Sequence, residues 1–269
     1  MGTSQDIVIL SATRVGMLMR CPRQYEFRYI QGLVRPPGAA LVLGRAFHKA
    51  MADLAMERAD GAEMEQDQAA DLFVDAFDAE AEGEVDWGEE KPGQIKDIGT
   101  KMATIGAETW VAPLHPWDIA GVEAKFDVLI PDYDEGKAVP FTGFRDLVLV
   151  GETGDLAVVD YKTSSRKWSP GRVIQEIQPM AYALPEYLST GLVPSFRFDI
   201  VVRPGEEGEG RVKTQSFPVQ SDRAAIEWWL DTVRRIYRLV QSGVFVPNPT
   251  GWWCSPKWCG YYDLCRGKA

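Results

Sequence analysis

The sequence predicts an α/β fold: a central mixed β-sheet flanked by helices, with a helical insertion and a cysteine-rich C-terminal clasp. The 269 residues are 45% hydrophobic and 25% charged, which is typical of a globular protein with a substantial core. Segments with the apolar spacing of helices are followed by segments with the period of strands. The tail GWWCSPKWCGYYDLCRGKA is rich in cysteine and aromatic residues, unlike the rest of the chain.

The first third of the chain is predicted to be helical. Ser11 stands at an N-cap position before a short helix that ends ahead of Pro22, and proline suits the start of a second helix. Apolar residues at helical spacing predict a further helix over residues 44–58, which carries His48. Residues 60–115 are predicted to be an acidic helical insertion.

The period changes to that of strands at residue 119. Alternation over residues 122–128 is followed by predicted strands over residues 141–150 and 156–162. Strands flanked by helices imply a mixed sheet that is covered on its faces. The later predictions are a helix over residues 170–188, strands over 196–202 and 212–217, and a long helix over 223–241.

The net charge of −10 argues against a nucleic-acid ligand, because phosphate contacts need lysine and arginine. The charge is uneven, however. Residues 51–92 contain fifteen carboxylates and two basic side chains, whereas residues 1–50 contain seven basic side chains and two carboxylates. A basic surface outside the acidic segment is therefore still compatible with the composition.

No stretch approaches the ~20 apolar residues of a membrane span, and the first ten residues lack the features of a signal peptide. We expect a cytoplasmic protein with no membrane partner. No motif recurs at a fixed period, so we expect a single domain over residues 1–269 rather than a repeat array.

Two of the predicted strands each carry a carboxylate near their end, Asp146 and Asp160. Period 2 places Asp160 and Lys162 on one face of their strand and Tyr161 on the other. An isolated D-x-K is usually a surface ion pair, but an apolar strand does not bury both charges without a reason. Two carboxylates can also hold Mg²⁺ together with a substrate phosphate. Glu123, one strand earlier, is either a further ligand or a structural ion pair, and we favour the ion pair.

Several motifs follow one another between residues 10 and 266. They are Leu10-Ser11-Ala12-Thr13, Cys21-Pro22-Arg23-Gln24-Tyr25-Glu26-Phe27-Arg28-Tyr29, His48, Asp146, Asp160-Tyr161-Lys162 and Gln178-Pro179-Met180-Ala181-Tyr182. Each is weak alone, but in this order the sequence resembles the RecB-like iron-sulfur branch of the PD-(D/E)XK nucleases. That branch includes CRISPR-associated and viral exonucleases. The resemblance implies a restriction-endonuclease-like core.

The resemblance also implies a role for each matching residue. His48, Asp146, Asp160 and the backbone carbonyl of Tyr161 would bind Mg²⁺ or Mn²⁺. Asp146, Asp160 and Lys162 would form the catalytic set, with Lys162 serving the attacking water. Without the resemblance, His48 would be an ordinary helix residue.

The same resemblance implies that further residues contact DNA. Gln178 and Tyr182, at i and i+4, share one helix face. Pro179 departs from the expected helix, because proline kinks a helix or starts one. Arg166 and Lys167, just after the D-x-K strand, could line a groove for the phosphate backbone, although a solvated surface explains them equally well.

Four cysteines form a second group, in which Cys21 lies far from Cys254, Cys259 and Cys265. Disulfides are not expected without an export signal, and one distant plus three clustered thiols is unusual for structural zinc. By the resemblance, the four thiolates bind a [4Fe-4S] cluster, and residues 252–266 with Cys21 form an iron-sulfur clasp. The C-x4-C spacing is wider than is usual in the family, so zinc stays open.

Five aromatic residues accompany these cysteines. They either shield the metal from solvent or stack on unpaired bases, and we favour shielding for most of them. The residues are Trp252, Trp253, Trp258, Tyr261 and Tyr262.

The function that follows is a metal-dependent DNA exonuclease acting on single-stranded DNA or DNA ends. Two alternatives stay open: a non-catalytic iron-sulfur DNA-binding or scaffold subunit with a nuclease fold, and an end-trimming nuclease in CRISPR spacer acquisition. The chain has no G-x-x-x-x-G-K-[ST] motif, so a helicase or recombination partner would supply any unwinding. An oligomer is compatible with the family, but no residue predicts one.

Overall fold

The computed structural model of the protein describes residues 8–65, 67–132, 134, 136–205 and 211–268. The expectation of no export signal rests on the first ten residues, of which 1–7 lie outside the described residues. Within the described part of the chain, every helix is too short or too polar to cross a bilayer.

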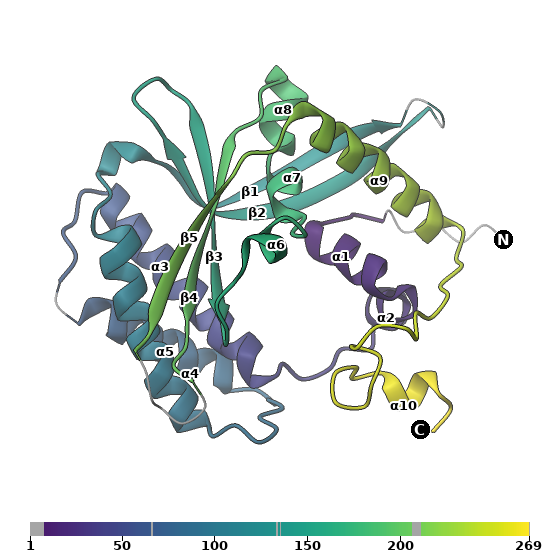
Figure 1. Ribbon diagram of the computed structural model, residues 1–269, viewed down its shortest axis with the longest axis horizontal. Coiled ribbons are helices and arrows are strands. Elements are labelled where there is room, and N and C mark those ends of the chain that lie inside the picture. The colour runs from purple at the N-terminus through teal and green to yellow at the C-terminus, as the bar shows by residue number, and fades with distance from the viewer. Residues whose placement is uncertain (1–7, 66, 133, 135, 206–210, 269) are drawn as a thin grey trace.

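A mixed β-sheet forms the centre of the molecule (Figure 1). Its strands lie side by side in chain order, and neighbours are antiparallel except for the parallel pair β3 and β4. In the described chain the strands are β1 (Ile119–Asp132), β2 (Lys137–Val150), β3 (Leu156–Ser164), β4 (Ser195–Val202) and β5 (Lys213–Val219). This sheet with its flanking helices is the predicted α/β architecture, and β1 and β2 are longer than predicted because they pair along a long hairpin.

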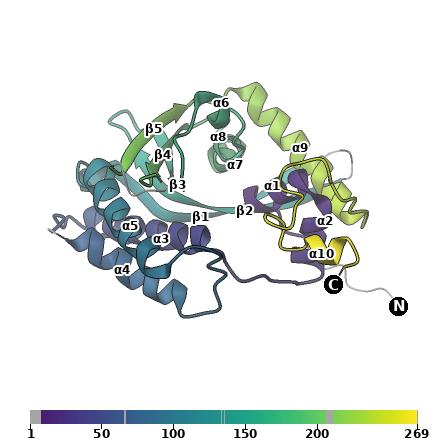
Figure 2. The ribbon, with the colours of Figure 1, turned by 60° about the horizontal axis from the view of Figure 1, so that its bottom comes forward.

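Three helices cover one face of the sheet (Figures 1 and 2). They are α3 (Ala39–Ala59), α4 (Gln68–Ala81) and α5 (Pro92–Gly106), which continues as the π-helix η2 (Ala107–Val111). Phe47 of α3 and Phe73 of α4 are buried in one core with Val159 and Tyr161 of the sheet. The helices within residues 60–115 thus share the core of the sheet, while most of their carboxylates face solvent. That this segment is an insertion stays a prediction.

A second core lies against the hairpin of β1 and β2. It contains residues of α1 (Ala12–Arg20), of α9 (Arg223–Gln241) and of the segment 181–187. Trp229 of α9 packs edge-on against Phe141 of β2, with ring centroids 6.3 Å apart. The N-cap prediction for α1 is confirmed, because the side chain of Ser11 accepts a hydrogen bond of 3.3 Å from the backbone N–H of Arg14.

The single helix predicted over residues 170–188 was wrong. The segment forms three short helices: α6 (Pro170–Val173), α7 (Gln178–Tyr182) and α8 (Leu184–Thr190). Each begins with a proline in its first two positions, at Pro170, Pro179 and Pro185. Proline has no backbone N–H and fits the first turn of a helix but not its interior, so each proline starts a new helix.

The first helices and the last residues of the chain lie side by side in both ribbon views (Figures 1 and 2). The elements are α2 (Pro22–Tyr25), its π-helical continuation η1 (Glu26–Ile30) and α10 (Tyr262–Cys265). Phe27 stacks on Tyr261 with ring centroids 5.3 Å apart, and the Tyr261 hydroxyl donates to the carbonyl of Leu33 at 2.6 Å. A 3₁₀ turn, η3 (Pro116–Asp118), precedes β1.

Candidate active site and cysteine cluster

Glu123 of β1 and Asp146 of β2 lie across from each other. The antiparallel register pairs the residues on either side of Glu123 with the residues on either side of Asp146. The backbone of Glu123 has a φ of +46°, in the left-handed region. Such strain costs about 1–3 kcal/mol in a residue other than glycine and clusters at functional sites. The strained backbone and the pairing of two carboxylates therefore make Glu123 and Asp146 candidates for a functional site.

Helix α3 brings His48 to the same place. Its Nδ1 lies 3.1 Å from Oδ2 of Asp146, and ligand atoms of His48, Glu123 and Asp146 all lie within 4.8 Å of one another. The backbone N–H of Tyr161 donates to the same Asp146 oxygen at 2.7 Å, which holds this carboxylate against β3. An imidazole with two carboxylates is a ligand set that suits divalent cations.

Strand β3 adds an ion pair next to this group. Lys162 Nζ contacts Oδ2 of Asp160, so the two side chains share a face of the strand as predicted. Asp160 is only 1% exposed, whereas the side chain of Lys162 keeps 23% of its surface in solvent. Asp160 is not a member of the three-residue group, since its carboxylate is turned to Lys162 instead.

Burial and neighbouring charges shift the three carboxyl groups differently. Burial raises the pKa of Asp160 to about 6, and the ammonium of Lys162 opposes this only in part. Burial also acts upward on Asp146, but His48, Lys162 and the N–H of Tyr161 together outweigh it, and the pKa of Asp146 is lowered. The pKa of Glu123 is raised by burial and by the charge of Asp146. Asp146 is thus the carboxyl group that ionises first.

Helix α7 lies against these carboxylates. The pKa of Tyr182 is raised by burial and then by Asp160, Asp146 and Glu123, so its phenol stays protonated and able to donate a hydrogen bond. Gln178, one turn earlier on the same helix, has a buried Oε1 with no hydrogen-bond partner among the described residues.

Arg166 and Lys167 lie beyond the carboxylate group, just after the end of β3. Both side chains are exposed. The next basic residue, Arg172, already has protein partners: its guanidinium lies over the ring of Trp168 and pairs with Glu176.

The structural ion pair favoured for Glu123 is not found in the part of the chain that the structure describes. No basic side chain lies within ion-pair distance of it among the described residues, and its carboxylate belongs to the three-residue group instead. Strict alternation would set Glu123 on the same face as the exposed Lys125 and Asp127. The register keeps it on that face, opposite Asp146, and what separates it from Lys125 and Asp127 is that helix α3 brings His48 over this end of the strand.

The family profile of the PD-(D/E)XK nuclease superfamily matches residues 9–266. The chain belongs to this superfamily. Membership agrees with the mixed sheet and its flanking helices, and it points to a nuclease whose substrate is DNA. The His48, Glu123 and Asp146 group is a place where a divalent metal of such a nuclease can bind.

Two solved structures resemble this PD-(D/E)XK protein. The protein SSO0001 matches with a TM-score of 0.44 and 13% identity, over 100% of this chain and 90% of that chain. A candidate exonuclease from Eubacterium rectale matches with a TM-score of 0.48 and 13% identity, over 100% and 94%. Neither likeness is strong enough to say what this chain cleaves. No curated protein sequence matches the chain.

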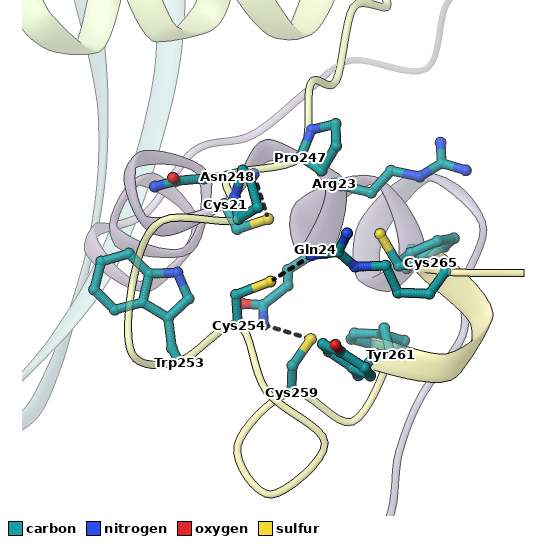
Figure 3. A pocket seen from close by; sticks show the side chains of 14 residues that line it. Cys21, Arg23, Gln24, Pro247, Asn248, Trp253, Cys254, Cys259, Tyr261 and Cys265 are labelled. Carbon is teal, nitrogen blue, oxygen red and sulfur yellow. Dashed lines mark hydrogen bonds between the residues drawn. The ribbon is translucent and has the colours of Figure 1, made fainter. Parts of the chain in front are cut away.

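The four cysteines of this PD-(D/E)XK protein come together in space, although more than 230 residues separate Cys21 from Cys254. All four are free thiols, and they line one cavity of about 160 Å³. Figure 3 shows their sulfur atoms turned toward this shared space. Gln24 Nε2 donates to the sulfur of Cys259 at 3.1 Å, and the backbone N–H of Asn248 donates to that of Cys21 at 3.4 Å.

The aromatic residues around these cysteines separate into two sets. Trp253, Tyr261 and Tyr262 line the thiol cavity, as the shielding interpretation expects. Trp252 and Trp258 do not line it and are 72% and 59% exposed.

Proposed function

We propose that the protein is a metal-dependent DNA exonuclease of the RecB-like iron-sulfur branch, acting on single-stranded DNA or DNA ends. The observation that carries the proposal is the convergence of His48, Glu123 and Asp146 within 4.8 Å, next to the buried pair of Asp160 and Lys162. Desolvating this many ionisable groups is unfavourable, so a fold used only as a scaffold would gain little by keeping them.

The residues of the group fit Mg²⁺ or Mn²⁺. Carboxylate oxygens are the ligands that these hard cations prefer, and imidazole also binds Mn²⁺. In the proposal Asp160 and the backbone carbonyl of Tyr161 complete the ligand set of His48, Glu123 and Asp146. When bound, the ion lowers the pKa of the attacking water and offsets negative charge at the scissile phosphate.

The protein's own groups have separate tasks in this reaction. Asp146 is kept ionised by His48 and oriented by the N–H of Tyr161. Burial acts to lower the pKa of Lys162, but Asp160 and Asp146 outweigh it, and the raised pKa keeps the ammonium charged. Lys162 therefore orients the attacking water and stabilises the charge that develops on the phosphate.

Four further residues bind the DNA in this proposal. The protonated hydroxyl of Tyr182 lies beside the carboxylates, and on the same helix the amide oxygen of Gln178 is buried with no hydrogen-bond partner in the described chain. Arg166 and Lys167 attract the phosphate backbone just beyond β3.

We also propose that Cys21, Cys254, Cys259 and Cys265 bind a [4Fe-4S] cluster. The four thiols line one cavity, and N–H groups donate to the sulfurs of Cys21, Cys254 and Cys259, as suits a thiolate-bound cluster. The cluster would then join residues 252–266 to Cys21 as a clasp on one nuclease domain, residues 1–269, with residues 60–115 as its acidic helical insertion.

The nuclease proposal is tested with end-labelled single-stranded DNA and duplex ends in Mg²⁺ or Mn²⁺. We expect the wild type to digest from an end and Lys162→Ala to be inactive. The matched control is Lys125→Ala, which removes an exposed lysine of β1 and should keep activity. An inactive wild type with either metal would favour the scaffold alternative, and equal digestion by Lys162→Ala would refute the assignment of the site.

The cluster is tested by purifying the protein without oxygen. A brown protein with about four irons per chain is expected from four thiolate ligands. A colourless protein that holds zinc would show that the cluster assignment is wrong.

A further inference from the structure

A groove of about 2350 Å³ lies outside the carboxylate site. Its lining includes Arg166, four residues beyond Lys162 on the chain, and reaches Trp252 and Trp258 near the C-terminus. None of the proposed metal ligands lines it. Small-molecule sites measure roughly 300–1,000 Å³, so this groove is sized for part of a polymer.

Two tryptophans of the C-terminal segment line the groove. Trp252 and Trp258 are 72% and 59% exposed, and their rings meet edge to face with centroids 5.5 Å apart. Trp253, between them in sequence, turns into the thiol cavity, and Gly251 permits this because a Cβ there would overlap the Trp253 ring. The segment thus places one indole against the thiols and leaves two for the groove.

Charge is distributed unequally around the groove. Arg166 and Arg211, near the ends of the sheet strands, and Lys257, near the tryptophans, have no ion-pair partner within the described ranges. Acidic residues of the segment 86–97 also line the groove, and one of them, Glu90, is paired with Arg203 at 3.0 Å. Lys257 Nζ also lies 5.4 Å from the centroid of the Trp258 ring, so positive charge and aromatic surface occur together.

This arrangement suits a single strand better than a duplex. A duplex carries phosphates around its whole circumference, and some of them would meet the carboxylates of residues 86–97. A single strand has one backbone, which can follow Arg166, Arg211 and Lys257 while its unpaired bases stack on aromatic rings.

We propose that the groove binds single-stranded DNA, with bases stacked on Trp252 and Trp258 and phosphates along Arg166, Arg211 and Lys257. The inference rests on the proposed function in one respect: the bound strand leads to the carboxylate site. The C-terminal segment then has a role in binding substrate besides holding the thiols.

Binding is measured by fluorescence anisotropy of a labelled oligothymidine without added divalent metal, so that no cleavage occurs. The wild type should bind this strand more tightly than a duplex of equal length. Trp252→Ala and Trp258→Ala should each weaken binding about tenfold, since one stacked base contributes roughly 1–3 kcal/mol. Trp228→Ala, which removes a 53% exposed indole of α9 outside the groove, should bind as the wild type does.

Trp252→Phe and Trp258→Phe separate stacking from damage to the fold. They keep an aromatic face and should retain most of the affinity, whereas a loss as large as in the alanine variants would overturn stacking. Unchanged binding by the alanine variants, or tighter binding of the duplex by the wild type, would also overturn the proposal.

Cleavage by the same proteins in Mn²⁺ is measured separately. Tryptophan-dependent binding without cleavage would support the groove and refute the nuclease proposal. Cleavage without any dependence of binding on the two tryptophans would refute the groove and leave the nuclease proposal standing.

Discussion

At Glu123 the chain holds a carboxylate on a strained backbone, at φ +46°, where it meets His48 and Asp146. A residue whose only task was to occupy a strand would gain nothing from this conformation. We propose that the strain accompanies a role of this carboxylate in the site.

Glu123→Gln tests this explanation. The amide keeps the shape of the side chain but loses the charge, so we expect Mn²⁺ affinity and DNA cleavage to fall roughly 10- to 100-fold, as when ligand support is removed from a metal site. The measurements are calorimetric titration with Mn²⁺ and the end-labelled assay. Asp127→Asn, on the exposed part of the same strand, is the matched control. If Glu123→Gln and Asp127→Asn had equal effects on Mn²⁺ affinity and cleavage, Glu123 would not be a metal ligand.

The pH dependence of metal binding follows from Asp160. Its pKa of about 6 lies above the ordinary value of 3.8. In the metal-free protein the bound proton stabilises the folded state fully below about 3.8, and this contribution is lost as the pH rises through about 6. Burial acts to lower the pKa of His48, but Asp146 and Asp160 together outweigh it and the pKa is raised, so His48 also holds a competing proton at low pH.

Metal ligands must lose these protons, so Mn²⁺ should raise the melting temperature more at about pH 7.5 than at about pH 5. Thermal unfolding with and without Mn²⁺ at both pH values measures this. The Asp127→Asn protein should keep the dependence. A larger Mn²⁺ effect at the lower pH would contradict the assignment of Asp160.

At the scale of elements, one glycine controls how three helices pack. A Cβ at Gly99 of α5 would overlap the Phe73 ring of α4 and Leu43 of α3. These side chains are buried in the core that also holds α3 against the sheet. Since α3 carries His48, this packing positions one residue of the candidate site.

Gly99→Ala should therefore lower the free energy of unfolding by about 1–2 kcal/mol. Overpacking costs about 1–3 kcal/mol, and the higher helix propensity of alanine offsets up to about 1 kcal/mol. Gly93→Ala in the same helix, where a Cβ has open space, should leave stability unchanged or slightly higher. Urea unfolding of both variants measures these changes. A Gly99→Ala protein as stable as the wild type would show that the surrounding side chains move aside without cost.

At the scale of the whole molecule, the thiol cavity joins the two ends of the described chain. Apart from the thiols, the contacts there are modest, such as the stacking of Phe27 on Tyr261. A bound cluster would close a loop of more than 230 residues between Cys21 and Cys254. Cross-links that close long loops restrict the unfolded chain most.

Cys21→Ser removes the one thiol contributed by the N-terminal helices. If the proposed cluster forms, the free energy of unfolding should fall by about 3–5 kcal/mol and the iron content should decrease. Ser255→Ala, close to Cys254 in sequence, serves as the control. Unfolding and iron content identical to the wild type would show that Cys21 is not a ligand.

Local patterns were sufficient for much of this protein. The period of apolar residues predicted the mixed sheet, α3 and α9, and alternation predicted that Asp160 and Lys162 share a face, because these features depend on neighbours in the chain. Spacing failed over residues 170–188, where each proline starts a helix instead of continuing one.

Which residues from distant parts of the sequence lie close together was decided only by the tertiary structure. His48 reaches Asp146 across almost one hundred residues, Glu123 joins them from the neighbouring strand, and Cys21 meets three thiols at the other end. Distances between such residues depend on how helices pack on the sheet, which no local period encodes. The roles of these residues, unlike their positions, stay predictions for the experiments above.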